Sequence, residues 1–154
     1  MAQGKNNKET AGNKTMVQMA IVYKGNLVSI YRNAELYASY QAKNIDLLRG
    51  KDNIAVFGLR HVGGGGRIDG SIEDARIYDK ALTVDEIKAL KPNKKSVNKP
   101  YAWWEFEGNK VVDRMGRYAH SKMAGGAKLS GGKLVLGKGA VLVAARTKEG
   151  AKIS

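Results

Sequence analysis

Two glutamates in the C-terminal third of the sequence have the spacing of a glycosidase pair. Glu105 and Glu107 alternate with apolar residues in a β-type run, so their side chains should share one strand face, about 7 Å apart. Hydrolysis of a glycosidic bond needs two carboxylates facing a cleft, roughly 5–10 Å apart. Solvated glutamates at a strand edge account for the same pattern. We therefore expect a protein that is not an enzyme.

The sequence lacks the residue patterns that other kinds of catalysis and metal binding require. The 154-residue chain has no cysteine, which excludes disulfides and thiolate metal sites. Its two histidines, His61 and His120, have no companion at metal-ligand spacing and are expected in loops. No nucleophile elbow or phosphate-binding loop is present. The four glycines at 63–66 are predicted to form a flexible connection.

Positive charge is concentrated in the C-terminal part of the chain. The net charge is +13, and residues 91–154 alone carry 14 basic and 4 acidic side chains. Such an excess attracts polyanions, although scattered lysines also serve solubility. The basic residues are not interleaved with aromatic ones as in a single-strand nucleic-acid platform, so nucleic acid is not the expected partner.

The length suits one domain, and nineteen glycines favour short strands joined by tight turns. Residues 1–15 are polar and are expected to form a flexible arm without the apolar segment of a signal peptide. No stretch approaches the roughly 18 apolar residues of a membrane span. We expect an extracellular or periplasmic location, reached as part of a larger exported chain.

The N-terminal half contains the pattern of several strands. Runs at 16–23, 27–31 and 35–40, separated by short turns, predict a three-stranded antiparallel meander. The apolar run 53–59 predicts a buried strand. Residues 70–78 predict one further strand, with Ile72 on the face opposite to Ala75 and Ile77.

One short helix is expected near residues 83–90. Thr83 can act as its N-cap, and Glu86 three residues later completes a capping box. Leu82 and Ile87 can pack together across the helix start, and Pro92 ends the helix.

The C-terminal part returns to short strands after a basic linker at 91–100. In the run 101–107, alternation places Trp104 and Phe106 on one face and Trp103 with the two glutamates on the other. Further short strands are predicted around 133–136 and 140–143, divided by glycine pairs. Together these elements predict an all-β fold, an antiparallel β-sandwich or jelly roll.

Residues 70–87 read Gly-Ser-Ile-Glu-Asp-Ala-Arg-Ile-Tyr-Asp-Lys-Ala-Leu-Thr-Val-Asp-Glu-Ile. This run resembles the closing motif of concanavalin A-like domains of the laminin-G type, in which a strand passes through Arg-Ile-Tyr into a short Glu-Ile helix. Residues 20–23 and 30–33 resemble the hairpin that precedes this motif. Ala34 stands where the family usually has glycine, which leaves the geometry of that turn open.

Later segments of the chain resemble the opening of the same kind of domain. These segments are residues 101–108, 112–113 and 132–136. The closing half, 16–90, therefore precedes the opening half, 101–154. One circularly permuted domain, 16–145, with the linker joining the old ends, explains this order. The alternative is a segment that crosses from one domain of a tandem array into the next.

The resemblance implies sugar binding through aromatic platforms and planar polar side chains. Candidates outside the expected core are Tyr37, Tyr40, Arg60, His61, Arg67 and Trp103. Many relatives bind calcium through loop carboxylates, for which Asp69, Asp74 and Asp113 are the available acids.

We expect a non-catalytic carbohydrate-binding module that is an accessory domain of a polysaccharide-degrading glycoside hydrolase. Its partners would then be a polysaccharide or oligosaccharide and a host catalytic domain. Two alternatives remain open: a structural or adhesion-type protein-interaction domain, and a basic domain that binds polyanions.

Overall fold

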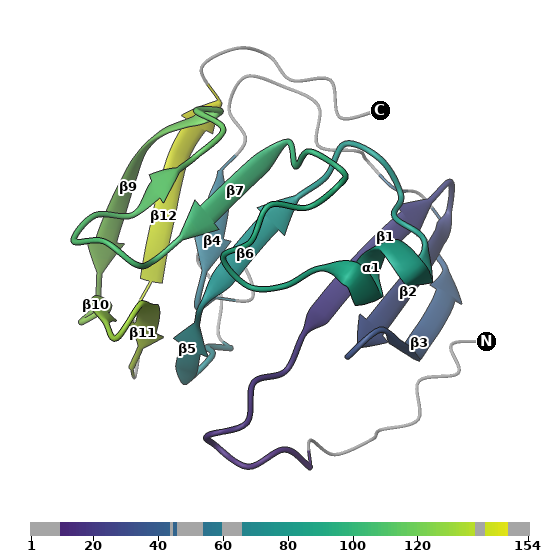
Figure 1. The fold of residues 1–154 in the computed structure, drawn as a ribbon, viewed down its shortest axis with the longest axis horizontal. Coiled ribbons are helices and arrows are strands. Elements are labelled where there is room, and N and C mark those ends of the chain that lie inside the picture. The colour runs from purple at the N-terminus through teal and green to yellow at the C-terminus, as the bar shows by residue number, and fades with distance from the viewer. Residues whose placement is uncertain (1–9, 44, 46–53, 60–65, 138–140, 148–154) are drawn as a thin grey trace. The chain divides into compact units, whose positions relative to one another are not determined.

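The computed structural model describes residues 10–43, 45, 54–59, 66–137 and 141–147 (Figure 1). The chain divides into two compact units. The first comprises Met1–Leu47 with Lys80–Lys91, and the second comprises Leu48–Asp79 with Pro92–Ser154. The described part is mostly antiparallel strands with one short helix, as predicted. The division into a closing half, a linker and an opening half rests on family likeness and stays a prediction.

The first unit contains the predicted meander. Strands β1 (Met19–Lys24), β2 (Leu27–Arg32) and β3 (Glu35–Gln41) pair antiparallel in chain order. Lys24 lies opposite Leu27, so only two residues form the first turn, and its Gly25 has a φ of 57°. A positive φ costs glycine nothing, and it matches the twist of the flanking strands.

The second turn of the meander holds an alanine in a left-handed conformation. Asn33 and Ala34 have φ values of 51° and 62°, the pattern of a type I′ turn. The side chain of Asn33 accepts a hydrogen bond from the Gln18 amide at 3.0 Å, which fixes this turn against the entry to β1. Ala34 therefore has the backbone geometry that glycine adopts freely, and its Cβ introduces strain of about 1–2 kcal/mol.

Ala34→Gly should raise the free energy of unfolding by about 0.5–1 kcal/mol, because relief of strain exceeds the extra chain entropy of glycine. Urea unfolding followed by circular dichroism measures the change. The matched control is Ala38→Gly within β3, which should lower the free energy of unfolding by about 0.5–1 kcal/mol. Equal losses in the two variants would contradict the left-handed turn.

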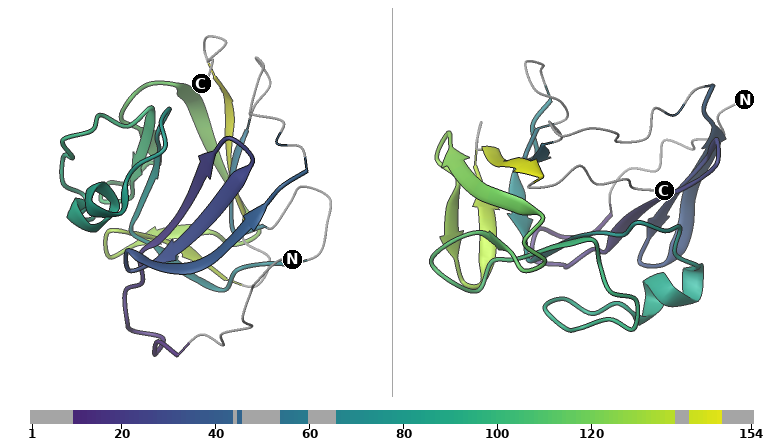
Figure 2. Two further views of the ribbon diagram at one scale, coloured as in Figure 1. Left: turned by 90° about the vertical axis from the view of Figure 1, so that its right-hand side faces the viewer. Right: turned by 90° about the horizontal axis from the view of Figure 1, so that it is seen from above.

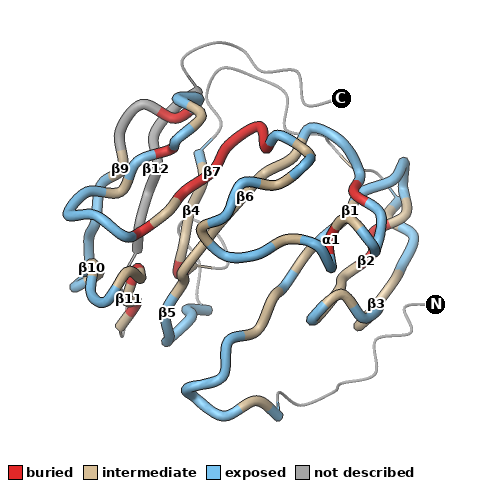
Figure 3. The backbone as a smooth tube through the Cα atoms, in the orientation of Figure 1, coloured by how far each residue is buried: buried red, intermediate tan, exposed pale blue. Residues whose placement is uncertain are grey.

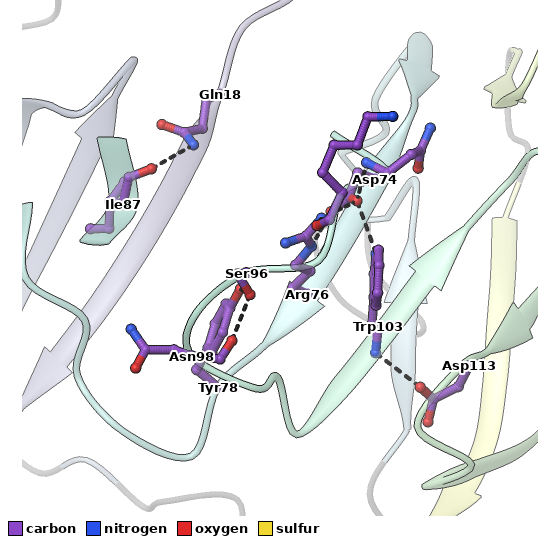
Figure 4. Close-up of polar contacts among 11 residues, drawn as sticks. Gln18, Asp74, Arg76, Tyr78, Ile87, Ser96, Asn98, Trp103 and Asp113 are labelled. Atoms are coloured by element: carbon purple, nitrogen blue, oxygen red, sulfur yellow. Dashed lines mark hydrogen bonds and ion pairs between the residues drawn. The ribbon is translucent and has the colours of Figure 1, made fainter. Parts of the chain in front are cut away.

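Helix α1 (Val84–Ala89) belongs to the first unit and has the predicted capping box. The Thr83 hydroxyl accepts from the Glu86 amide, and the Glu86 carboxylate accepts from the Thr83 amide. Ile87 is 1% exposed, and its carbonyl accepts a hydrogen bond from the Gln18 side chain at 3.0 Å (Figure 4). A helix this short needs such contacts to persist.

Among its described residues, the second unit contains three three-stranded antiparallel sheets. Each joins a strand that precedes α1 to strands that follow it. The sheet orders are β10 (Lys128–Ser130)–β11 (Lys133–Leu136)–β5 (Gly70–Ile72), β4 (Ala55–Phe57)–β12 (Val141–Thr147)–β9 (Tyr118–Ala124), and β6 (Asp74–Ile77)–β7 (Ala102–Glu105)–β8 (Val112–Asp113). Figure 2 shows β12 between β4 and β9.

Aromatic side chains from one face of β7 and the residues after it form the core of the second unit. Trp104 and Phe106 are 1% and 0% exposed and belong to one core cluster that does not include Trp103, which confirms the predicted alternation. Figure 3 shows β7 as buried along most of its length. Phe57 packs edge-on against Trp104 with ring centroids 5.4 Å apart, and Tyr118 lies 5.0 Å from the same tryptophan ring. Burial raises the pKa of the Tyr118 phenol above its usual range.

The prediction of one continuous strand over 70–78 is wrong. The chain bends at Glu73, and β5 and β6 join different sheets. Because strand side chains alternate, this break changes which residues share a face. Ile72 therefore packs against the same core as Ala75 and Ile77, which corrects its predicted position on the opposite face.

Candidate functional site

The Asp74 carboxylate joins three segments of the second unit (Figure 4). Its Oδ1 accepts from Arg76 Nε at 2.8 Å. Its Oδ2 accepts from Arg76 Nη2 at 2.8 Å, from the Asn93 amide at 2.8 Å and from Trp103 Nε1 at 2.9 Å. The Asp74 and Arg76 side chains are 14% and 5% exposed. This partly buried carboxylate thus binds its own strand, the loop after α1 and strand β7.

Trp103 lies between cationic groups from both neighbouring strands of its sheet. Arg76, opposite it on β6, places its guanidinium carbon 4.4 Å from the indole centroid, and Arg114, which follows β8, places its own at 5.2 Å. Both distances fall within the range of cation–π attraction. Trp103 is only 5% exposed, which corrects its expected position outside the core as a sugar platform.

Asp113 accepts four backbone hydrogen bonds. Its Oδ1 accepts from the Trp103 and Met115 amides, both at 2.9 Å. Its Oδ2 accepts from the Arg117 and Tyr118 amides at 2.7 and 3.0 Å. The carboxylate therefore holds the turn between β8 and β9 against β7.

The three acids proposed for calcium do not fit a calcium site. Calcium requires 6–8 oxygen ligands with free lone pairs, and the hydrogen bonds above occupy the carboxylates of Asp74 and Asp113. Asp69 is exposed just before β5. Within the described ranges, no three histidine, cysteine, aspartate or glutamate side chains are grouped to hold a metal ion.

A shallow hollow of about 170 Å³ lies where β7 ends and β8 begins. It is lined by Glu105, Glu107, Gly108, Lys110, Val112 and Arg114. Arg114 forms an ion pair with Glu105 at 2.5 Å, and Asn93 Nδ2 donates to Glu107 Oε1 at 2.8 Å. The two glutamates singled out in the sequence therefore line one hollow, although Glu105, whose side chain is 8% exposed, is not the solvated glutamate that was expected.

The absence of a side chain at Gly132 leaves room for the Glu107 carboxylate at this hollow. A Cβ at residue 132 would lie 2.8 Å from a Glu107 oxygen, and the φ of Gly132 is 72°. The hollow offers acceptors from the glutamates and donors from Lys110 and Arg114. Such an arrangement can bind a ligand that carries several hydroxyl groups.

The remaining predicted site residues lie elsewhere or outside the described residues. Tyr37 and Tyr40 are on β3 of the first unit, half-buried and 41% exposed respectively. Arg67 is exposed and forms an isolated bridge with Leu59 in the second unit. Arg60, His61 and most of the glycine loop fall outside the described residues. The structure brings together Trp103, Asp74 and Asp113, although as a hydrogen-bonded network.

Sequence reasoning missed Arg76, Lys110 and Arg114. The Arg76–Trp103 contact depends on the register of β6 with β7, which joins residues far apart in sequence. Arg114 could have been noticed, because it directly follows Asp113, a residue already singled out. Lys110 has no local signal that separates it from the other lysines.

A laminin-G-type model of the concanavalin A-like lectin/glucanases superfamily matches residues 4–88. This match covers more than half of the chain, and the chain belongs to that superfamily. The membership confirms the predicted family and, together with the antiparallel sheets, the jelly-roll sandwich class. The likeness of residues 101–136 to an opening half lies beyond the matched range and stays a prediction.

The membership defines a lectin-like fold of the general carbohydrate-binding kind, in a class of domains that are typically non-catalytic. Comparisons with curated proteins and with solved structures find no significant match. Among the helices that the structure describes, none is long and apolar enough to cross a membrane.

Asp74→Asn should lower the free energy of unfolding by about 3 kcal/mol, because it removes the carboxylate that pairs with Arg76, whose side chain is only 5% exposed. Denaturant unfolding measures the loss. The neighbouring Glu73→Gln is the control, since Glu73 forms a longer and more exposed pair with Lys133 at 3.5 Å, and it should cost less than about 1 kcal/mol. Similar losses in both variants would show that the network adds no stability of its own.

Calcium and EDTA should leave the Tm unchanged, because a ligand raises the Tm only if it binds the folded state, and the hydrogen bonds above occupy Asp74 and Asp113. Differential scanning fluorimetry with millimolar calcium chloride or EDTA measures the shift. A rise in Tm with calcium that disappears in Asp113→Asn would contradict this reading of the carboxylates.

Proposed function

We propose that this protein is a non-catalytic carbohydrate-binding module and serves as an accessory domain of a polysaccharide-degrading glycoside hydrolase. The observation that carries the proposal is the hollow at the end of β7, in a chain of the lectin/glucanase superfamily. An exported parent chain, acting outside the cell or in the periplasm, fits this role. The laminin-G-type resemblance supports the accessory role beside a hydrolase.

The hollow suits recognition of sugar hydroxyls. Glu107 and Lys110 are both exposed at its rim, so one can accept and the other can donate hydrogen bonds to neighbouring hydroxyls. The Glu105–Arg114 pair forms another part of the lining and presents both signs of charge. Because the lining is polar, affinity should come mainly from hydrogen bonds.

The state of the two glutamates favours binding over hydrolysis. The Glu105 side chain is only 8% exposed and is paired with Arg114. Glu107 accepts a hydrogen bond from Asn93. A glycosidase needs one carboxylic acid that donates a proton to the leaving group and a second carboxylate free to act on the sugar or on water. Glu105 does not have that freedom, so the pair lacks one of the two groups that hydrolysis needs.

Binding can be tested by affinity electrophoresis of the chain in gels that contain neutral or acidic polysaccharides. The unchanged protein should be retarded by at least one of them. Glu107→Gln and Lys110→Ala should each weaken binding roughly tenfold, the effect of losing one hydrogen bond to a charged group.

Lys128→Ala, on β10 and outside the hollow, removes one exposed lysine and should bind as the unchanged protein does. Absence of retardation in every polysaccharide would overturn the proposal. Release of reducing sugars that Glu105→Gln abolishes would show an enzyme instead.

A further inference from the structure

We propose that the loop between Pro92 and Pro100 is an anion-binding surface that makes this module selective for acidic polysaccharides. The inference deepens the proposed carbohydrate binding and rests on it. The ligand class is a polysaccharide whose sugars carry carboxylate groups.

Hydrogen bonds hold the backbone of this loop in place (Figure 4). The Asn93 amide donates to Asp74, and the Lys94 carbonyl accepts from Arg76 Nη2 at 2.7 Å. The Ser96 hydroxyl contacts the Tyr78 hydroxyl at 3.1 Å and donates to the Asn98 carbonyl at 2.5 Å. A loop fixed in this way loses little further conformational entropy when it binds a ligand.

The loop presents an excess of positive charge without acidic neighbours in sequence. Lys94, Lys95 and Lys99 are exposed, and no carboxylate of the described residues forms an ion pair with any of them. No acidic residue occurs in the sequence between positions 86 and 105. Three exposed cations therefore lie on a fixed backbone, and none of them forms an ion pair with a carboxylate of the described residues.

The acidic side chains that follow the loop do not cancel this charge. Residues 91–137 contain ten basic side chains and three acidic ones. Glu105 is paired with Arg114, while Glu107 and Asp113 accept hydrogen bonds from neutral donors and keep their charge, so a clear excess of positive charge remains. The resulting field should attract an anionic chain and raise its rate of association.

The loop adjoins the hollow through Asn93. The side chain of Asn93 bonds Glu107 at the rim of the hollow, and Lys94 and Lys95 follow directly. A polysaccharide with one sugar in the hollow can therefore pass Asn93 and place the carboxylate of a neighbouring sugar near these lysines. The hollow would then bind hydroxyl groups of the polysaccharide, and the loop would bind its carboxylates.

A polysaccharide fits these observations better than a nucleic acid. Single-stranded nucleic acids bind on exposed aromatic side chains, whereas Trp103 and Trp104 are 5% and 1% exposed. The glutamates of the hollow can accept hydrogen bonds from sugar hydroxyls, whereas a phosphodiester group has no hydroxyl to donate.

The test uses polygalacturonate and highly methyl-esterified pectin, which share a backbone and differ in charge. At 50 mM salt, the unchanged protein should bind polygalacturonate about tenfold more tightly, and most of the advantage should disappear at 200 mM salt. The triple variant Lys94→Gln, Lys95→Gln, Lys99→Gln should lose this preference and still bind the esterified polymer. Lys95→Gln alone should lose part of it.

The matched control is Lys14→Gln, Lys24→Gln, Lys43→Gln, which removes the same charge from exposed positions in the first unit. It should keep the preference for polygalacturonate. Equal loss in both triple variants would overturn the inference in favour of net charge alone. Duplex DNA bound as tightly as polygalacturonate through the same three lysines would overturn it in favour of nucleic acid.

Failure of the two proposals can be told apart. Equal binding of the two polymers by the unchanged protein would contradict the selectivity for acidic polysaccharides but not the proposed carbohydrate binding. If the protein binds neither polymer and no other polysaccharide, both the proposed function and the proposed selectivity are wrong. Circular dichroism and the Tm establish that each variant is folded. If the triple variant does not fold, Lys95→Gln decides the outcome.

Discussion

The hydrogen bonding of the partly buried Asp74 carboxylate is the interaction on which the second unit depends. Its acceptor positions are filled by the guanidinium of Arg76, the amide of Asn93 and the indole of Trp103. These groups come from β6, from the loop that follows α1 and from β7. A charge with so little exposure persists only when it is paired and hydrogen-bonded, so the three segments must be in place together.

The two-residue period of β7 connects this network to both the core and the hollow. Trp103 faces Arg76 and Arg114, Trp104 enters the core, and Glu105 returns to the side of Arg114. Packing of Trp104 against Phe57 and Tyr118 therefore fixes the direction of Trp103 and Glu105. The shape of the hollow is in this way a consequence of core packing. A binding site needs such support, because its side chains must be held in place by a rigid element.

The sequence predicted the elements whose signals are local. The meander, the capped helix, β11 and the burial of Trp104 and Phe106 all follow from periodicity, turn residues and capping within short windows. Strand β9 was missed because its sequence, Tyr-Ala-His-Ser-Lys-Met-Ala, lacks apolar alternation. The break at Glu73 and the stacking of two arginines on Trp103 depend on pairing between distant segments, which no local pattern contains. Likewise, the sequence cannot distinguish a carboxylate that binds calcium from one, such as Asp113, that accepts backbone amides.

The pairing of β6 with β7 within one chain is the central claim, because it joins the segments before and after α1 and orients Trp103. It can be tested most directly by NMR on a mixture of isotope-labelled and unlabelled chains. Cross-strand NOEs between Arg76 and Trp103, and between Ala75 and Trp104, should arise within a single chain and be absent from the filtered intermolecular spectrum. The same NOEs appearing only between chains, or not at all, would contradict the account.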